Sequence, residues 1–221
     1  MRYLGLALYA EGRTDYYFLQ PLLERLCMDL CLREASGPVE VTAVLGLDHP
    51  PAIEQAPRDV RIREAARSAL GQWSLLFVHA DGAGDPVRAR AQQIDPALGA
   101  LHTAFGTAGC GVAVVPVRET EAWTLVDGDA LRQVFGTTLD DDALGLPQPA
   151  HCAETVTDPK KCLDLAFAAT SPTGARRRRG VSDYLGALGE EIRLDRLRLL
   201  DSFLALEDEL RRALRGLNLL R

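Results

Sequence analysis

The sequence predicts an α/β protein in which helices flank a mostly parallel, four-stranded sheet and a helical extension follows at the C-terminus. Two observations lead to this prediction. Apolar runs of strand length alternate with helical patterns over residues 1–120. The runs are apolar throughout, without a polar residue at every second position, and this is typical of parallel strands that are covered on both faces.

The predicted elements follow from these runs and from the turn residues between them. Strands are expected at residues 3–10, 39–47, 74–80 and 111–117, where apolar and β-branched residues gather. Helices are expected at 14–32, 59–70, 86–94, after Pro96, and at 120–135, 159–169 and 182–216, with loops at 48–58, 136–158 and 171–181. Thr14 is the expected N-cap of the first helix, and Pro21 is expected to kink or interrupt it.

The order of these elements also suggests how the chain is organised. Strand patterns are confined to its first part, so we expect an α/β domain over residues 1–135 and a helical extension over residues 136–221 that packs on the same domain. A length of 221 residues is sufficient for one sizeable core of this kind.

Composition and charge limit the function classes. The net charge is −6, but residues 160–221 carry more basic than acidic groups, so the acidic part of the chain suits a cation site and the basic part suits a polyanion. No apolar run reaches about 18 residues and no signal peptide is evident, so we expect no membrane partner. The five cysteines form no CxxC pair, which indicates reduced thiols in a cytoplasmic protein.

Carboxylates follow three of the four predicted strands. Glu11 comes directly after the first strand, Asp81 after the third and Glu119 after the fourth. Because the ends of parallel strands meet at one edge of a sheet, these carboxylates are expected to lie close together, where Mg²⁺ or Mn²⁺ would relieve their mutual repulsion. Further acidic residues lie two to four positions beyond: Asp15, Asp85 and Glu121.

A purely structural interpretation of these acids is also open. Acidic residues often cap helices, and Asp85 stands directly before Pro86, where a helix can begin. Glu119 could similarly flank a helix capped by Thr120. Glu11 is the hardest to explain in this way, because Gly12 beside it permits a close approach of the backbone. His79, on the third strand, is expected to be a hydrogen-bonded core histidine.

Several motifs resemble those of a known family. EGRTD at residues 11–15 resembles the EGxxD opening motif of Toprim domains, and VHADGAGD at residues 78–85 is similar to their second acidic motif. VPVRETEAWTLVDGDAL followed by DPKKCL is similar to domain-of-unknown-function family 4276, a group of bacterial Toprim-like proteins. The resemblance implies a Toprim-like, Rossmann-like fold and Mg²⁺-dependent phosphodiester chemistry, as in nucleases of the overcoming-lysogenization-defect type.

The resemblance also implies roles for individual residues. Glu11 would be a metal ligand or general acid–base, Asp15 would assist it, and Asp81 would be the principal metal ligand. The usual second motif is Asp-x-Asp, but position 83 is alanine here, so Asp85, Glu119 or Glu121 would have to supply the missing ligand. Members of such families are expected beside a separately encoded ATPase in bacterial phage defence, and a homo-oligomer is compatible with the sequence.

Basic residues in the C-terminal part are candidates for phosphate contacts. Their side chains would bind the backbone of a nucleic acid, DNA more than RNA, without regard to sequence and with a strong dependence on salt. A solvated loop is the competing interpretation of the arginine run. The candidates are Lys160, Lys161, Arg176, Arg177, Arg178 and Arg179.

The leading hypothesis is therefore a Mg²⁺- or Mn²⁺-dependent nuclease or nicking subunit with Glu11, Asp15 and Asp81 as its catalytic residues. The first alternative is a catalytically degenerate module that binds nucleic acid or a partner ATPase, which Ala83 favours. The second is a phosphoesterase that acts on small molecules. No GxxxxGK[ST] or GxGxxG motif is present, so no nucleotide-binding loop of those types is expected.

Overall fold

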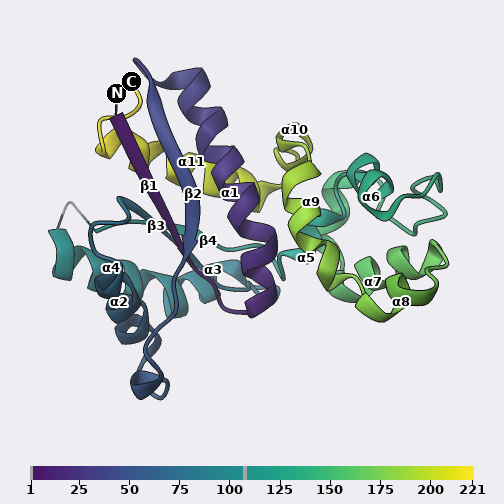
Figure 1. Ribbon diagram of the computed structural model, residues 1–221, viewed down its shortest axis with the longest axis horizontal. Coiled ribbons are helices and arrows are strands. Elements are labelled where there is room, and N and C mark those ends of the chain that lie inside the picture. Colours follow the sequence, from purple (N-terminus) through teal and green to yellow (C-terminus); the bar gives the residue numbers. More distant parts are fainter. Residues whose placement is uncertain (1, 107–108) are drawn as a thin grey trace.

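In the computed structural model, the chain forms one sheet of four parallel strands in the order β2–β1–β3–β4 (Figure 1). The structure describes residues 2–106 and 109–221. The parallel pairing confirms the predicted α/β class. The strands are β1 (Arg2–Tyr9), β2 (Val39–Gly46), β3 (Leu75–His79) and β4 (Cys110–Val114).

Helices connect and cover the strands. Between the strands lie α1 (Arg13–Glu34), η1 (Pro51–Ile53), α2 (Arg58–Ser68), α3 (Pro86–Ala89), the π-helical turn η2 (Arg90–Ile94) and α4 (Asp95–Phe105). After β4 come α5 (Glu121–Thr124), α6 (Gly128–Phe135), η4 (Ala150–Thr155), α7 (Pro159–Ala169), α8 (Gly174–Arg179), η5 (Ser182–Tyr184), α9 (Leu185–Glu191), α10 (Leu194–Leu197) and α11 (Asp201–Gly216).

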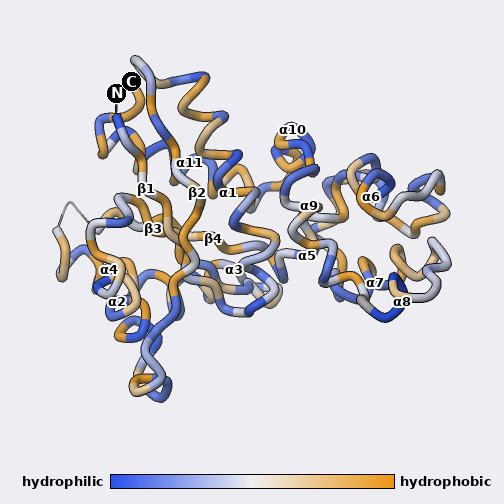
Figure 2. The backbone as a smooth tube through the Cα atoms, in the orientation of Figure 1, coloured by the Kyte–Doolittle hydropathy of each residue, from blue (hydrophilic) through white to orange (hydrophobic). Residues whose placement is uncertain are grey.

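Successive side chains of each strand point to opposite faces of the sheet, and both faces are buried. Leu6 and Phe77 lie in the larger core, which α1 and α11 cover, whereas Ala7 and Leu76 lie in the smaller core under α2 and α4. Burial on both faces explains why the strands read as continuous apolar runs. Figure 2 shows this hydrophobic interior along β1, β3 and β4.

The helical extension is joined to the sheet by its last helix. Glu209 of α11 accepts hydrogen bonds from Arg90 Nη1 at 2.5 Å and from the backbone N–H of Ala113 at 2.9 Å. The two termini also lie together (Figure 1), because Arg2 Nη1 donates to the Asn218 carbonyl at 2.7 Å. The larger core runs without a break from β1 to α11. The predicted boundary at residue 135 stays a prediction.

Helix α1 differs from its prediction at its start and at Pro21. Gly12, not Thr14, is the N-cap residue, and the Gly12 N–H donates to Asp15 Oδ2 at 2.8 Å. The helix continues through Pro21 instead of restarting there. Helix α9 packs closely on this part of α1, because a Cβ at Gly189 would lie only 2.3 Å from the Phe18 carbonyl oxygen. This packing helps to hold α1 together where proline removes a backbone hydrogen bond.

Several further expectations need correction. The helix expected at 182–216 is divided into η5, α9, α10 and α11, and the loops expected at 48–58 and 136–158 contain η1 and η4. The segment 171–181, which was expected to be a loop, contains α8, and the arginine run forms most of that helix. Strand β4 ends at Val114 instead of residue 117, and the chain then turns towards β3. The cysteines are free thiols. In residues 2–106 and 109–221, no helix is both long and apolar enough to cross a membrane.

Candidate active site

The strand order places the first two acidic motifs at a topological switch point. The chain passes from β1 to β2 on one side and then to β3 on the other side of β1. Ligands of open α/β sheets bind beyond the carboxyl ends of the strands at such a point. Glu11 follows β1 and Asp81 follows β3, and the Asp81 N–H donates to Glu11 Oε2 at 3.0 Å. The structure therefore brings these two predicted site residues together.

The loop after Asp81 is held against the segment that leads from β4 to Glu119. Ala83 N–H donates to the Arg118 carbonyl at 3.2 Å, and Gly84 N–H donates to the Val117 carbonyl at 2.8 Å. Position 82 must be glycine for this contact, because a Cβ there would lie 2.2 Å from the Pro116 carbonyl oxygen. Backbone pairing thus joins the Asp81 loop to the segment that leads to Glu119.

Asp15 is fixed by hydrogen bonds on both of its carboxylate oxygens. Oδ2 accepts from the Gly12 N–H at 2.8 Å, and Oδ1 accepts from the Thr120 hydroxyl at 2.9 Å. Asp15 is only 7% exposed. These contacts tie the start of α1 to the segment before α5, so Asp15 acts here as a residue that positions its neighbours.

His79 lies between two of the predicted acids. Its ring is fully buried, with Nδ1 3.5 Å from Asp15 Oδ2 and Nε2 3.4 Å from Asp81 Oδ1. The Glu11 N–H also donates to His79 Nδ1, at 3.4 Å. His79 is buried as the sequence predicts, and its position between Asp15 and Asp81 is the feature that the sequence did not show.

Two carboxylate oxygens at this site are buried without a hydrogen-bond partner among the described residues. They are Asp81 Oδ1 and Glu119 Oε2. The 3.4 Å between His79 Nε2 and Asp81 Oδ1 does not make a hydrogen bond, since both atoms are left unpartnered. A buried carboxylate oxygen without a donor is costly, and such atoms indicate a group that the protein alone does not supply.

The predicted site acids also share an absence of basic partners. Within the described chain, no lysine or arginine forms an ion pair with any of them, and His79 is the only basic side chain that approaches two of them. Five of these acids are called the acidic rim below, namely Glu11, Asp15, Asp81, Glu119 and Glu121.

Electrostatic repulsion within the acidic rim is visible at Glu121. Burial raises the pKa of this carboxyl, and the charges of Asp15 and Glu119 raise it further. Lys160, at the start of α7, acts in the opposite direction. The basic DPKK motif therefore lies within electrostatic reach of the rim, as helix α7 packs beside α5.

The carboxylate oxygens of the acidic rim are suitable ligands for a hard divalent cation. Mg²⁺ and Mn²⁺ prefer carboxylate oxygens, and the unpartnered oxygens of Asp81 and Glu119 are of this kind. Over residues 2–106 and 109–221, no three histidine, cysteine, aspartate or glutamate side chains converge as a ready-made metal site. Glu11 is exposed, and its side chain would turn towards an ion by giving up the hydrogen bond from the Asp81 N–H.

The remaining acidic candidate, Asp85, has a local structural partner. Its Oδ1 accepts a hydrogen bond from the Arg88 N–H at 3.0 Å, and it thereby caps α3. This is the capping arrangement that the Asp85-Pro86 sequence allows. Asp85 is exposed at the end of the loop that begins at Asp81.

The basic candidates divide into exposed and internally bound side chains. Lys160, Lys161, Arg177 and Arg178 are exposed. Arg176 instead donates to the Phe135 carbonyl and lies over the Phe167 ring, with its guanidinium carbon 5.4 Å from the ring centroid. The side chain of Arg179 lies outside the described residues. Helix α8 is at the far end of the helical extension from the sheet (Figure 1).

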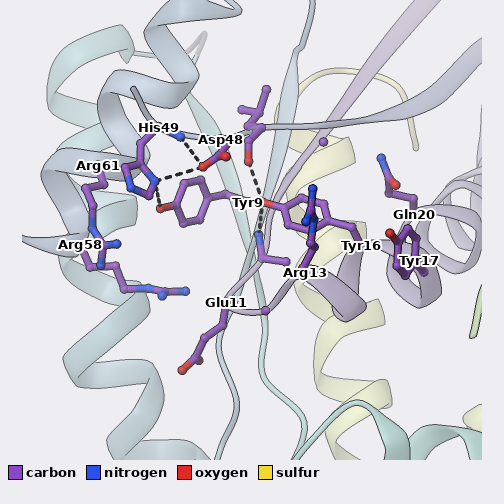
Figure 3. Close-up of a pocket in the computed structure, with 14 residues that line it drawn as sticks. Tyr9, Glu11, Arg13, Tyr16, Tyr17, Gln20, Asp48, His49, Arg58 and Arg61 are labelled. Carbon is purple, nitrogen blue, oxygen red and sulfur yellow. Dashed lines mark hydrogen bonds and ion pairs between the residues drawn. The ribbon is translucent and has the colours of Figure 1, made fainter. Parts of the chain in front are cut away.

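A cavity beside the acidic rim contains residues that sequence reasoning missed. It lies beyond the ends of β1 and β2, has a volume of about 540 Å³, and is shown in Figure 3. Arg58 and Arg61 line it from α2, and neither was among the predicted site residues. The sequence signal that could have indicated them is their spacing of three residues at a helix start, because it places both side chains on one helix face.

Comparisons of the chain with models of known protein families, with curated proteins and with solved structures give no significant match. The resemblance of EGRTD and its companion motifs to Toprim domains therefore stays a prediction from the sequence.

Proposed function

We propose that this protein is a Toprim-like, divalent-metal-dependent phosphoryl-transfer enzyme that hydrolyses phosphodiester bonds in nucleic acid. One observation carries the proposal. The carboxylates at the switch point of the sheet have no lysine or arginine partner in the described chain, and Asp81 Oδ1 and Glu119 Oε2 are buried without any hydrogen-bond donor. A cation from solution would satisfy both oxygens and remove the repulsion along the acidic rim.

The residues of the rim have separate roles in this proposal. Glu11, Asp81 and Glu119 would hold Mg²⁺ or Mn²⁺, which when bound would polarise a phosphoryl oxygen and offset the charge of the carboxylates. Asp15 and His79 are positioning residues, because Asp15 is hydrogen-bonded on both oxygens and His79 lies between Asp15 and Asp81. Glu121, which is buried beside them, contributes negative charge.

The substrate contacts follow from the exposed basic residues. Lys160 is exposed at the start of α7, and its charge lowers the pKa of Glu121, so it would attract a phosphate towards the rim. Arg177 and Arg178 lie further away on α8 and would bind a more distant part of a strand. Such contacts to the phosphate backbone give affinity without sequence preference.

Cleavage of supercoiled plasmid, with and without Mn²⁺, tests the proposal. We expect cleavage to require the metal and to fall by roughly 100-fold or more in Glu11→Gln, the size of effect that loss of a key electrostatic group produces. Glu54→Gln, an exposed glutamate on a loop, is the matched control and should cut at the wild-type rate. Equal cleavage by wild type and Glu11→Gln would show that the site is wrongly assigned.

A second candidate function is a degenerate, non-catalytic module that binds nucleic acid or a partner ATPase. Position 83 favours it, since alanine replaces the second aspartate of the Asp-x-Asp motif there. Calorimetric titration with Mn²⁺ separates the two functions. If the protein is an enzyme, it should bind Mn²⁺ in the micromolar to millimolar range, and Asp81→Asn should lose this binding. A degenerate protein would bind no Mn²⁺ and would cut no plasmid.

A further inference from the structure

The cavity beside the acidic rim has a strongly basic wall. Arg58 and Arg61 extend into it from α2, and Figure 3 shows both on the side of the cavity opposite Tyr17. Neither arginine forms an ion pair with a carboxylate in the described part of the chain, and the Nε atom of each is buried without a hydrogen-bond partner. Burial lowers the pKa of Arg58, an effect that the nearby charge of Glu11 opposes.

Contacts with His79 and Tyr9 fix Arg58 at the edge of the acidic rim. Its Nη2 donates to the His79 carbonyl at 2.5 Å, and its guanidinium carbon is 5.8 Å from the centroid of the Tyr9 ring. The arginine is therefore held in place before any ligand arrives. A guanidinium presents donors in a planar fork that suits phosphate oxygens.

Two acidic residues also line the cavity, but they do not neutralise the positive charge of Arg58 and Arg61. The Asp48 carboxylate lies 3.2 Å from His49 Nδ1, and its side chain is 91% exposed, so much of its charge faces solvent. The Glu11 carboxylate accepts the hydrogen bond from the Asp81 N–H at the other edge. Arg13 adds a further positive charge from the start of α1. An anion can therefore approach the two arginines of α2.

Aromatic side chains form the other walls of the cavity. The Tyr9 hydroxyl lies 2.9 Å from His49 Nδ1, and the Tyr16 hydroxyl donates to the Leu47 carbonyl at 2.6 Å. Burial raises the pKa of Tyr16 to about 12, so this phenol stays neutral and does not repel an anion. Tyr17 is 53% exposed, and its ring offers a face on which a nucleobase can stack.

We propose that this cavity binds a phosphorylated nucleotide, with Arg58 and Arg61 on its phosphate and Tyr17 beside its base. The volume of about 540 Å³ lies within the usual range of small-molecule sites. The inference rests on the proposed function, because Glu11 belongs to both sites and a nucleotide bound here would stand next to the bond that is cut. The ligand is either a free mononucleotide or the phosphorylated end of a strand.

Binding measured in EDTA tests the inference without any cleavage. Adenosine monophosphate, adenosine and inorganic phosphate are titrated by calorimetry, and a short oligonucleotide is compared with and without a 5′-phosphate. We expect the monophosphate to bind at least about tenfold more tightly than adenosine, the advantage of a charge-assisted phosphate contact. A similar preference for the phosphorylated oligonucleotide would assign the cavity to strand ends, and its absence would assign it to free nucleotides.

Variants of α2 locate the binding. Arg61→Gln should weaken monophosphate binding about tenfold. Arg58→Gln should do the same, but it also breaks the hydrogen bond to His79, so thermal unfolding of both variants is measured alongside. Arg67→Gln is the matched control, because this exposed arginine of α2 pairs with Glu64 and lies outside the cavity.

The outcomes separate this inference from the proposed function. Equal binding of monophosphate and adenosine, or wild-type binding by a folded Arg61→Gln, overturns the cavity assignment even if plasmid cleavage still depends on Glu11. Conversely, phosphate-dependent binding that needs Arg61, in a protein that cuts no plasmid, leaves the cavity assigned and removes the nuclease. Glu11→Gln should bind the monophosphate more tightly than wild type, because it removes a negative charge from the cavity edge.

Discussion

Two groups of carboxylates with buried oxygen atoms have opposite surroundings in this protein. At the start of α6, Asp127 is 1% exposed and accepts hydrogen bonds from Arg193 Nε and Nη2, both at 3.0 Å. Glu207 of α11 is 4% exposed and pairs with several arginines, namely Arg33, Arg198 and Arg211. At the acidic rim, Asp81 and Glu119 have no such partner in the described chain.

Under the proposed function, this contrast separates carboxylates that hold the fold together from carboxylates that would bind a metal. A buried acid that is surrounded by guanidinium groups is satisfied within the chain, so its removal leaves arginines unpaired. A buried acid without a donor stays costly until something from solution compensates it. We therefore expect Asp81 and Glu119 to decrease stability in the free protein, as functional sites often do. The predictions below test this contrast from the largest expected effect to the smallest.

The first prediction concerns the network around Glu207. Glu207→Gln should lower the free energy of unfolding by about 2–3 kcal/mol, because loss of a buried partner is costly and partial exposure of the arginines reduces that cost. Chemical denaturation measures the change. Asp208→Asn, an exposed neighbour that pairs only with Arg211, should have little effect. A Glu207→Gln protein as stable as wild type would show that the two groups of acids do not differ as described.

The second prediction concerns stabilisation by metal at the acidic rim. Mn²⁺ at 100 times its dissociation constant should raise the free energy of unfolding of the wild type by about 2.7 kcal/mol. Asp81→Asn should lose this increase and, without metal, should be at least as stable as wild type, because the unpartnered Oδ1 no longer belongs to a charged group. Chemical denaturation of the wild type and of Asp81→Asn, each with EDTA and with Mn²⁺, gives the four free energies of unfolding. A large loss of stability in metal-free Asp81→Asn would place Asp81 with the structural acids.

The third prediction follows from the raised pKa of Glu121. Between its ordinary value of 4.5 and the raised value, the native protein holds more protons than the unfolded chain, so stability falls as pH rises through this window. Glu121→Gln removes that penalty. We expect its Tm to exceed that of wild type by a few degrees at pH 7 and the difference to vanish below pH 4.5. A gain that is the same at both pH values would rule out the titration of Glu121 as its cause.

The fourth prediction concerns the alanine in the second motif. Ala83 has a φ of 48°, a left-handed conformation that aspartate tolerates better than alanine. Ala83→Asp should therefore fold normally and, by adding a carboxylate near Asp81, raise the affinity for Mn²⁺ by a few-fold. Ala83→Asn is the control for conformation without charge. If both variants bind Mn²⁺ as wild type does, position 83 has no part in the site.

The sequence was sufficient to predict the sheet and most of its acidic edge. Continuous apolar runs predict parallel strands buried on both faces, and parallel strands bring Glu11 and Asp81 to one edge whatever covers the sheet. The hydrogen bond from the Asp81 N–H to Glu11 is a direct consequence of β1 and β3 being neighbours.

The rest of the site depends on contacts between distant segments. Asp15 and His79 acquire their positions from Thr120 and Asp81, and no local pattern contains these pairings. Arg58 is directed inward by the end of β3, because its guanidinium binds the His79 carbonyl. The spacing of Arg58 and Arg61 places both on one helix face, but it does not show whether that face points to the site or to solvent.

The most direct test is a crystal soaked in Mn²⁺, with anomalous diffraction used to locate the ion. The proposed function predicts a peak at the carboxyl edge of β1 and β3, at about 2.0–2.3 Å from carboxylate oxygens, a spacing typical of small divalent ions. Asp81 and Glu119 should be ligands, with Glu11 turned towards the ion. A fully soaked crystal with no peak at this edge, or with Mn²⁺ bound only elsewhere, would contradict the metal site on which the function depends.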